Sequence, residues 1–125
     1  MIVGLGIDLV ETDRMARAVE EHGVRLEERV FSPLEREECA ARADRVQALA
    51  ARFAAKEACL KALGTGWARG LSFRQVQVIR EPGGRPGLVL EGAARDRARE
   101  LGVRRVHVSL THQPGAAAAV VVLES

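Results

Sequence analysis

The chain has 125 residues, a length that supports one domain and argues against two. Its 47 % hydrophobic and 29 % charged residues are typical of a globular protein and exclude a disordered chain. A net charge of +2 and an aromatic content of 3 % argue against nucleic-acid binding, and no apolar run reaches the roughly 18 residues that span a bilayer. We therefore expect a single cytoplasmic domain over residues 1–125, with no membrane and no nucleic-acid partner.

The N-terminal segment predicts a strand followed by a helix. Residues 2–7 form an apolar run of strand length, which ends at Asp8. Thr12 or Asp13 is a suitable N-cap for a helix with apolar residues at helical spacing. We expect Gly23 to end this helix, because glycine is common just beyond helix C-termini.

Two further helices are expected between residues 32 and 64. Ser32 and Glu35 form a capping box with proline at the first helical position, which predicts a short helix to about residue 42. Asp44 and Gln47 have the same spacing and predict the start of a longer helix. Gly64 is its expected C-terminal stop.

The second half of the chain predicts mostly strands. Apolar segments at 76–79 and 88–90 flank a Pro/Gly turn and form a hairpin, and an arginine-rich helix covers 92–102. Alternation over 106–111 and the apolar run after the 113–115 turn predict two more strands. The fold class is therefore α+β, with helices packed against a mainly antiparallel sheet.

Two carboxylates and one lysine are the first candidates for chemistry. Asp8 follows an apolar strand, where a lone carboxylate is costly to bury, although a turn or capping aspartate explains it equally well. Glu57 precedes Lys61 by one helical turn, which is also the spacing of an ordinary surface ion pair. If Asp8 and Glu57 meet in space, they form a hard-oxygen site suited to Mg²⁺.

Basic residues near the same segment suggest a polyphosphate ligand. The only two lysines, Lys56 and Lys61, lie five positions apart and follow Arg52. The glycine-rich segment 64–66 would let backbone N–H groups approach phosphate, although Gly64 also serves as a helix stop. His112 directly follows an alternating strand and is expected at an accessible sheet end, where a plain surface histidine is the simpler interpretation.

Five motifs in order match one known family. They are Gly6-Ile7-Asp8-Leu9-Val10-Glu11, Arg29-Val30-Phe31-Ser32-Pro33-Leu34-Glu35, the segment from Arg52 to Gly66, Gly84-Arg85-Pro86, and Val108-Ser109-Leu110-Thr111-His112. With these motifs the chain resembles holo-acyl-carrier-protein synthase, the short bacterial class of 4′-phosphopantetheinyl transferase. The resemblance covers nearly the whole length, and the segment from Arg52 to Gly66 is its most specific part.

The resemblance implies a reaction in fatty-acid biosynthesis. Coenzyme A would donate 4′-phosphopantetheine to a serine of apo-acyl carrier protein, releasing adenosine 3′,5′-bisphosphate. Asp8 and Glu57 would bind Mg²⁺, and Lys61 would hold phosphate oxygens. Glu57, directly or through water, and His112 both remain candidates for the proton acceptor. The residues that the resemblance assigns to coenzyme A binding are Arg52, Phe53, Lys56, Gly64, Thr65, Gly66 and Pro86.

The resemblance also implies partners. Family members form trimers with active sites between subunits, so Asp8 and Glu57 of one chain would face His112 and Pro86 of another. The first helix would dock the acidic carrier protein, with Arg14, Arg17 and Arg25 as the candidate contacts.

Two positions depart from the family pattern. Gln113 stands where some relatives have an acid, and Arg85 replaces a lysine in the turn before Pro86. A non-catalytic adaptor of the same fold is the main alternative function, and a small RNA-binding protein using the arginines of 95–105 is a weaker one.

Overall fold

The computed structural model describes residues 1–65 and 68–125. Its elements are β1 (Ile2–Glu11), α1 (Thr12–Val30), α2 (Pro33–Ala40), α3 (Arg45–Leu63), the 3₁₀ turns η1 (Ala68–Gly70) and η2 (Phe73–Gln75), β2 (Val76–Arg80), β3 (Pro86–Leu90), α4 (Gly92–Glu100), β4 (Arg105–Gln113) and β5 (Ala116–Glu124). This order of strands and helices confirms the α+β prediction.

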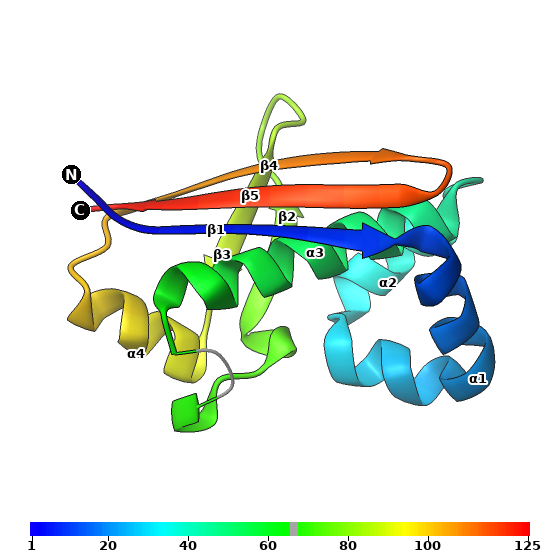
Figure 1. The fold of residues 1–125 in the computed structure, drawn as a ribbon, viewed down its shortest axis with the longest axis horizontal. Coiled ribbons are helices and arrows are strands. Elements are labelled where there is room, and N and C mark those ends of the chain that lie inside the picture. The colour runs from blue at the N-terminus through cyan, green and yellow to red at the C-terminus, as the bar shows by residue number, and fades with distance from the viewer. Residues whose placement is uncertain (66–67) are drawn as a thin grey trace.

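The strands form two antiparallel sheets. One has the order β1-β5-β4, and the other is the β2–β3 hairpin. Figure 1 shows the three-stranded sheet along one side of α3, with α1 and α2 at one end of the molecule and α4 at the other. The two termini lie side by side, where Ser125 N–H donates to the carbonyl of Met1 at 2.9 Å.

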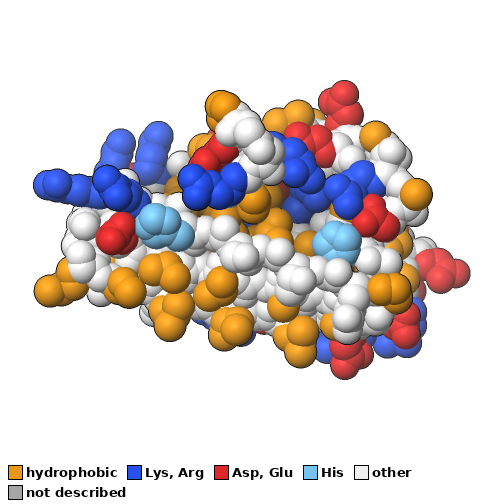
Figure 2. Space-filling model, turned by 90° about the horizontal axis from the view of Figure 1, so that it is seen from above, with side chains coloured by type: hydrophobic (Ala, Val, Ile, Leu, Met, Phe, Trp, Pro, Cys, Tyr) orange, Lys and Arg blue, Asp and Glu red, His pale blue; other side chains and the backbone are white. Residues whose placement is uncertain are grey.

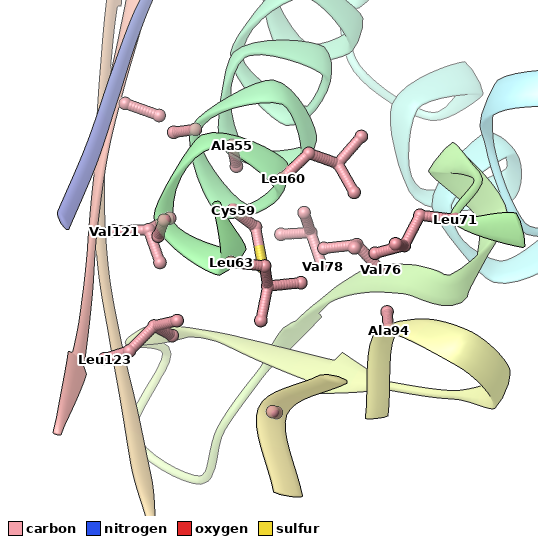
Figure 3. Close-up of a cluster of buried hydrophobic side chains, with 14 of the residues drawn as sticks. Ala55, Cys59, Leu60, Leu63, Leu71, Val76, Val78, Ala94, Val121 and Leu123 are labelled. Carbon is pink, nitrogen blue, oxygen red and sulfur yellow. The ribbon is translucent and has the colours of Figure 1, made fainter. Parts of the chain in front are cut away.

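Helix α3 is the centre of the hydrophobic core. Its Leu63 and Cys59 side chains have no exposed surface and pack between Val121 of β5 and Val76 of β2 (Figure 3). A second apolar cluster packs the start of α3 against α1 and α2. Because alanine is frequent along α3, neighbouring elements approach its backbone closely, and the positions of both sheets depend on this helix.

Two glycines let β1 lie directly on α3. A Cβ atom at Gly6 would overlap the carbonyl oxygen of Ala58, and one at Gly4 would overlap the carbonyl oxygen of Ala62. The alternation of β1 then turns Asp8 toward α3, on the same strand face as both glycines. The sequence predicted the end of the strand at Asp8, but β1 continues to Glu11, because β5 pairs with it through Ala116.

The helix starts and stops agree with the sequence only in part. The Ser32–Glu35 capping box is present, with Ser32 Oγ accepting from Glu35 N–H at 3.2 Å. Gly23 does not end α1: with φ 54° and ψ −135° it kinks the helix, which resumes and runs to Val30. Glycine adopts this positive φ without a steric penalty, so a helix can resume directly after it.

Asp44 is at the N-cap position of α3, as expected, but the expected side-chain capping bonds of α1 and α3 do not form. Glu11, rather than Thr12 or Asp13, is the N-cap of α1 and makes no capping bond through its side chain. Asp44 is the N-cap residue of α3, but its side chain is bound to Arg42 instead of the helix. The Thr12 hydroxyl accepts from Gly115 N–H at 2.9 Å and so ties the start of α1 to the β4–β5 turn.

Among the described residues no helix has the length and apolar character needed to cross a membrane.

Candidate functional site

The structure brings Asp8 and Lys61 into direct contact. Lys61 Nζ lies 3.0 Å from Asp8 Oδ1 and donates a second bond to the carbonyl of Ile7 at 3.0 Å. Lys61 is in the last turn of α3, and Asp8 faces it because the glycines of β1 bring the strand against the helix. The Lys61 side chain stays half exposed, at 54 %. This ammonium is therefore accessible to a ligand.

Glu57 belongs to the same cluster. Burial and the neighbouring charge of Asp8 raise the pKa of Glu57 above its usual range, while Lys61 opposes the shift. The two carboxylates are thus close enough to repel each other, at a place that water reaches only partly. A cation between them would relieve this repulsion. In the described part of the chain no cluster of three or more His, Cys, Asp or Glu side chains could hold a metal. The sequence selected Asp8 and Glu57 as candidate ligands, and the structure places them near each other.

A second group of predicted residues lines a cavity of about 210 Å³ on the opposite side of α3. Arg52, Pro86 and His112 contribute to its wall. Arg42 and Arg80 also line it, although the sequence analysis did not select them. Arg42 could have been found from the surplus of positive charge over residues 42–61. Arg80 could have been found from its position directly after the predicted strand at 76–79.

The charges around this cavity are partly compensated. Arg52 Nη2 donates to Glu38 Oε2 at 3.1 Å, while its buried Nε has no hydrogen-bond partner within the described residues. Arg42 makes a two-point contact with Asp44, at 2.7 and 3.0 Å. The cavity therefore presents guanidinium groups and an imidazole, which suit a negatively charged ligand.

Helix α3 separates the two groups of residues. Glu57 and Arg52 are five positions apart, which places them about 140° apart around the helix. Asp8 lies on β1 at one edge of the sheet, and His112 lies on β4 at the other edge. A single chain therefore does not bring Asp8, Glu57 and Lys61 together with His112 and Pro86.

Lys56 differs from the sequence prediction. Its side chain has no exposed surface, its Nζ lies 2.8 Å from Glu35 Oε1, and it donates to the carbonyls of Phe73 and Val76. Desolvation lowers the pKa of Lys56, and Glu35 counters this effect. An ammonium enclosed in this way has no free donor facing solvent, so the structure argues against a phosphate contact by Lys56.

The glycine-rich segment is described only in part. Gly64 ends α3 in the left-handed conformation, with φ 79°, and its N–H donates to the carbonyl of Lys61. The Thr65 hydroxyl is buried, with no hydrogen-bond partner among the described residues. Gly66 lies outside those residues, so its predicted role is not addressed by the structure.

The remaining predicted residues lie around α1. Phe53 packs against Phe73 with ring centroids 5.0 Å apart, and it lines an apolar cavity together with Arg14. Arg14 and Arg17 are exposed on one side of α1, one turn apart, and Arg25 is exposed beyond the kink. These arginines are available to a partner, but they are not part of either group described above.

The site chemistry defines a class of protein. Two carboxylates beside an accessible ammonium, with an arginine-lined cavity on the same chain, are typical of an enzyme that acts on a substrate rich in phosphate.

The comparisons with known proteins are specific. The model of the 4′-phosphopantetheinyl transferase superfamily matches residues 4–121. The holo-[acyl-carrier-protein] synthase of Maridesulfovibrio salexigens is 47 % identical over 99 % of this chain and 99 % of its own. That of Anaeromyxobacter dehalogenans is 51 % identical over 99 % of this chain and 97 % of its own.

Solved structures agree with these sequence relatives. The holo-[acyl-carrier-protein] synthase of Neisseria meningitidis has a TM-score of 0.91 and 34 % identity, with both chains fully covered. That of Helicobacter pylori, solved in complex with coenzyme A, has a TM-score of 0.84 and 32 % identity over 96 % of this chain and 99 % of that one. The chain belongs to the 4′-phosphopantetheinyl transferase superfamily, and the expectation of a transferase of this family is confirmed.

Proposed function

We propose that this chain transfers 4′-phosphopantetheine from coenzyme A to a serine of apo-acyl carrier protein, in fatty-acid biosynthesis and in the cytoplasm. The products are holo-acyl carrier protein and adenosine 3′,5′-bisphosphate. The observation that carries the proposal is the cluster of Asp8, Glu57 and Lys61, because two carboxylates and one accessible ammonium suit a divalent cation and a pyrophosphate. The names of the full-length relatives support the carrier, and their coenzyme A complexes support the donor.

The Asp8–Glu57 pair fits Mg²⁺. Both donors are hard oxygens, and Mg²⁺ usually takes one or two carboxylates and fills its other positions with water or substrate phosphate. Burial and, to a lesser extent, the charge of Asp8 raise the pKa of Glu57, and a cation bound to both carboxylates would offset these effects. When bound, the metal would supply neutralisation of charge on the transferred phosphoryl group. Asp8 and Glu57 hold it, and Lys61 remains free to turn from Asp8 toward phosphate oxygens.

Other residues of the chain bind the rest of coenzyme A in this proposal. Gly64 and Thr65 follow directly after the turn that holds Lys61. The Gly64 N–H already donates to the carbonyl of Lys61, so the Thr65 hydroxyl, which has no partner among the described residues, is the group that would bind phosphate here. The cavity lined by Arg52, Pro86 and His112 receives the remaining charged part of the donor.

The serine proton has two candidate acceptors. Glu57 is near the transferred phosphate and has a raised pKa, which favours proton uptake, but a metal-bound carboxylate is a weak base. His112 lies in the other group of residues, with its side chain 28 % exposed. Water bridging from either group remains an option in this mechanism.

The family resemblance implies a trimer with active sites between subunits, and the separation of the two groups supports sites that are shared between chains. The sheet face that turns away from α3 is apolar: Leu5, Ile7 and Leu9 are 65 %, 66 % and 70 % exposed. Val120 and Val122 of β5 pair with this row. Figure 2 looks down on the molecule, with hydrophobic side chains along the lower half of the view and Lys and Arg mainly in the upper half. Contiguous apolar surface of this kind is typical of an interface.

The acyl carrier protein docks on α1 in this proposal. Arg14, Arg17 and Arg25 are exposed cations, and an acidic carrier would be steered toward them. Phe53 and the apolar cavity beside Arg14 lie next to this surface, which gives the contact an uncharged part.

Intact-mass spectrometry of apo-acyl carrier protein tests the function directly. The carrier is incubated with this protein, coenzyme A and Mg²⁺, and a parallel sample contains a chelator. A gain of one phosphopantetheine, about 340 Da, that is lost with the chelator is expected for a metal-dependent transferase. Carrier binding without any mass gain, using a carrier that another transferase modifies, would instead establish the adaptor.

A further inference from the structure

Two side chains that the sequence assigns to a helix cap instead surround His112. Asp44 and Gln47 have capping-box spacing, yet the Asp44 side chain makes no capping hydrogen bond to α3. Gln47 Oε1 lies 3.0 Å from His112 Nδ1, and Asp44 Oδ2 lies 3.9 Å from His112 Nε2. One ring nitrogen of His112 thus contacts Gln47, from the first turn of α3, and the other faces Asp44, the residue before that helix, at a longer distance.

The contact with Gln47 favours one tautomer of His112. Gln47 turns its amide oxygen toward Nδ1, and because an amide oxygen only accepts hydrogen bonds, this arrangement suits a neutral imidazole that donates its Nδ1–H. The lone pair then resides on Nε2. We propose that Gln47 is a positioning residue that holds His112 in the tautomer whose Nε2 accepts the serine proton during phosphopantetheine transfer. This inference rests on the proposed function and selects His112 among its candidate acceptors.

Asp44 lies on the Nε2 side of the ring, at a distance of 3.9 Å that is too long for it to accept a hydrogen bond from Nε2. Its two contacts with Arg42 hold the pKa of this carboxyl below its usual range, so Asp44 stays charged beside His112. A carboxylate near Nε2 gains from a proton arriving there, because the imidazolium is of opposite charge. Arg52 and Arg80 line the same cavity and oppose this gain, but Arg52 is paired with Glu38, and Arg80 is exposed and bonded to the carbonyl of Gly84.

The proton transfer balances as follows. The serine O–H bond breaks and its proton moves to Nε2, while the serine oxygen forms a bond to the β-phosphorus of coenzyme A. The bond from that phosphorus to the bridging oxygen breaks, and adenosine 3′,5′-bisphosphate leaves with the electron pair. His112 then returns its proton to solvent, with Nδ1–H still donated to Gln47.

Imidazole ¹⁵N NMR of the whole protein measures the tautomer without using activity. The chain has three histidines, and His112→Asn assigns the signal. In its neutral form His112 is expected to carry its proton on Nδ1. His107 serves as an internal reference, because its Nε2 lies 3.1 Å from Glu124 Oε1 and is expected to carry the proton. A wild-type His112 protonated on Nε2 would overturn the proposal.

Two variants separate positioning from folding. Gln47→Leu removes the acceptor and is expected to shift His112 toward the Nε2–H tautomer. Gln47→Glu keeps an acceptor at Nδ1 and is expected to retain the wild-type tautomer. If Gln47→Leu leaves the His112 signals unchanged while remaining folded, the proposed contact is wrong.

Kinetics of the same variants test the catalytic consequence. Gln47→Leu is expected to lower kcat about tenfold, which is less than the roughly 10²- to 10⁴-fold that the general base itself supplies, with KM for coenzyme A changed less than about twofold. Gln47→Glu is expected to recover kcat, because its carboxylate oxygen accepts the same Nδ1–H bond. If the wild type transfers phosphopantetheine and Gln47→Leu has the same kcat, the positioning role of Gln47 is wrong and the proposed function stands. Absence of transfer by the wild type overturns the function itself, whatever the tautomer.

Discussion

Lys56 Nζ lies 2.8 Å from Glu35 Oε1, and neither side chain has any exposed surface. Glu35 also accepts from the N–H groups of Ser32 and Val78, each at 2.8 Å. Lys56 donates to two carbonyls and lies 5.7 Å from the centre of the Phe31 ring. One buried ion pair thus connects α2, α3 and β2. Both of its charged groups also make hydrogen bonds to the backbone.

Removal of one partner of this pair should destabilise the fold. Lys56→Met leaves Glu35 as an uncompensated buried charge, which costs about 3–5 kcal/mol of unfolding free energy in comparable cases. Urea unfolding followed by circular dichroism measures the loss. The double variant Lys56→Met with Glu35→Leu should be less destabilised than the single variant, because both charges are then absent.

Lys61→Met is the matched control, since it changes the other lysine of the chain. Its ammonium is half exposed, so we expect a stability change below about 1 kcal/mol but a large loss of transferase activity. The opposite pattern, with Lys56→Met stable and impaired in coenzyme A binding, would restore the phosphate contact that the sequence suggested for Lys56.

The difference between these two lysines marks the limit of the sequence prediction. Both lie in one helix, and helical spacing shows that they face different directions without showing which direction is buried. The capping role of Glu35 was predictable because its partner Ser32 is three residues away. Its bond to Val78 was not, since that contact spans 43 positions and depends on how the hairpin packs.

The same reasoning applies to the candidate site. Asp8, Glu57 and Lys61 could be selected because their motifs are specific, and the structure brings them together. Gln47 could not be selected, because its spacing from Asp44 indicated a helix cap and its contact with His112 crosses to another strand. Local patterns predict bonds within about one helical turn, whereas contacts across the core depend on packing.

Substitution of Gly6 should separate the two carboxylates. A Cβ at this position overlaps the backbone oxygen of Ala58, so Gly6→Ala must push β1 away from α3. We expect a loss of about 1–3 kcal/mol in unfolding free energy, together with weaker Mg²⁺ activation of the folded protein. Gly87→Ala is the control, because its added Cβ meets only the flexible Glu81 side chain. Equal effects of the two variants would contradict the role of close β1–α3 packing.

The Mg²⁺ requirement should depend on pH. The pKa of Glu57 is raised above 4.5, so protons compete with the metal for this carboxylate at pH values where an ordinary glutamate is fully ionised. As pH falls toward the raised pKa, the Mg²⁺ concentration for half-maximal transfer should increase. Saturating Mg²⁺ should therefore shift the acid limb of the activity profile to lower pH.

Activity measured against both Mg²⁺ and pH tests this competition. Glu100→Gln is a suitable control, since Glu100 is exposed on α4 and its arginine partners lower its pKa. This variant should behave as the wild type. A half-maximal Mg²⁺ concentration that stays constant across the acidic range would rule out Glu57 as a metal ligand.

The apolar sheet face should control oligomeric state. Ile7→Glu introduces a charge in the middle of the exposed row, between Leu5 and Leu9, and burying that charge in an interface is unfavourable. Light scattering at micromolar concentration should show a trimer for the wild type and a smaller species for the variant. Val89→Glu is a control, because Val89 is exposed on the separate β2–β3 hairpin. A monomeric wild type would contradict the shared site.

Mixing of two inactive variants should restore activity if active sites are shared between chains. Glu57→Ala removes one group of residues, and His112→Ala removes the group on the other side of α3. In a ring of three chains, a working site forms wherever the intact Glu57 of one subunit meets the intact His112 of its neighbour. When the two variants mix randomly in equal amounts, about one quarter of the sites have both intact groups.

The measurement is transfer activity after the two variants are co-expressed or are mixed under conditions that exchange subunits. Glu57→Ala mixed with Asp8→Ala is the negative control, because both changes damage the same group and no neighbour can complement them. Recovery in the first mixture alone is expected for a site assembled from two chains. If trimers exchange and neither mixture recovers, all the required groups act within one chain, and the two sides of α3 have separate roles.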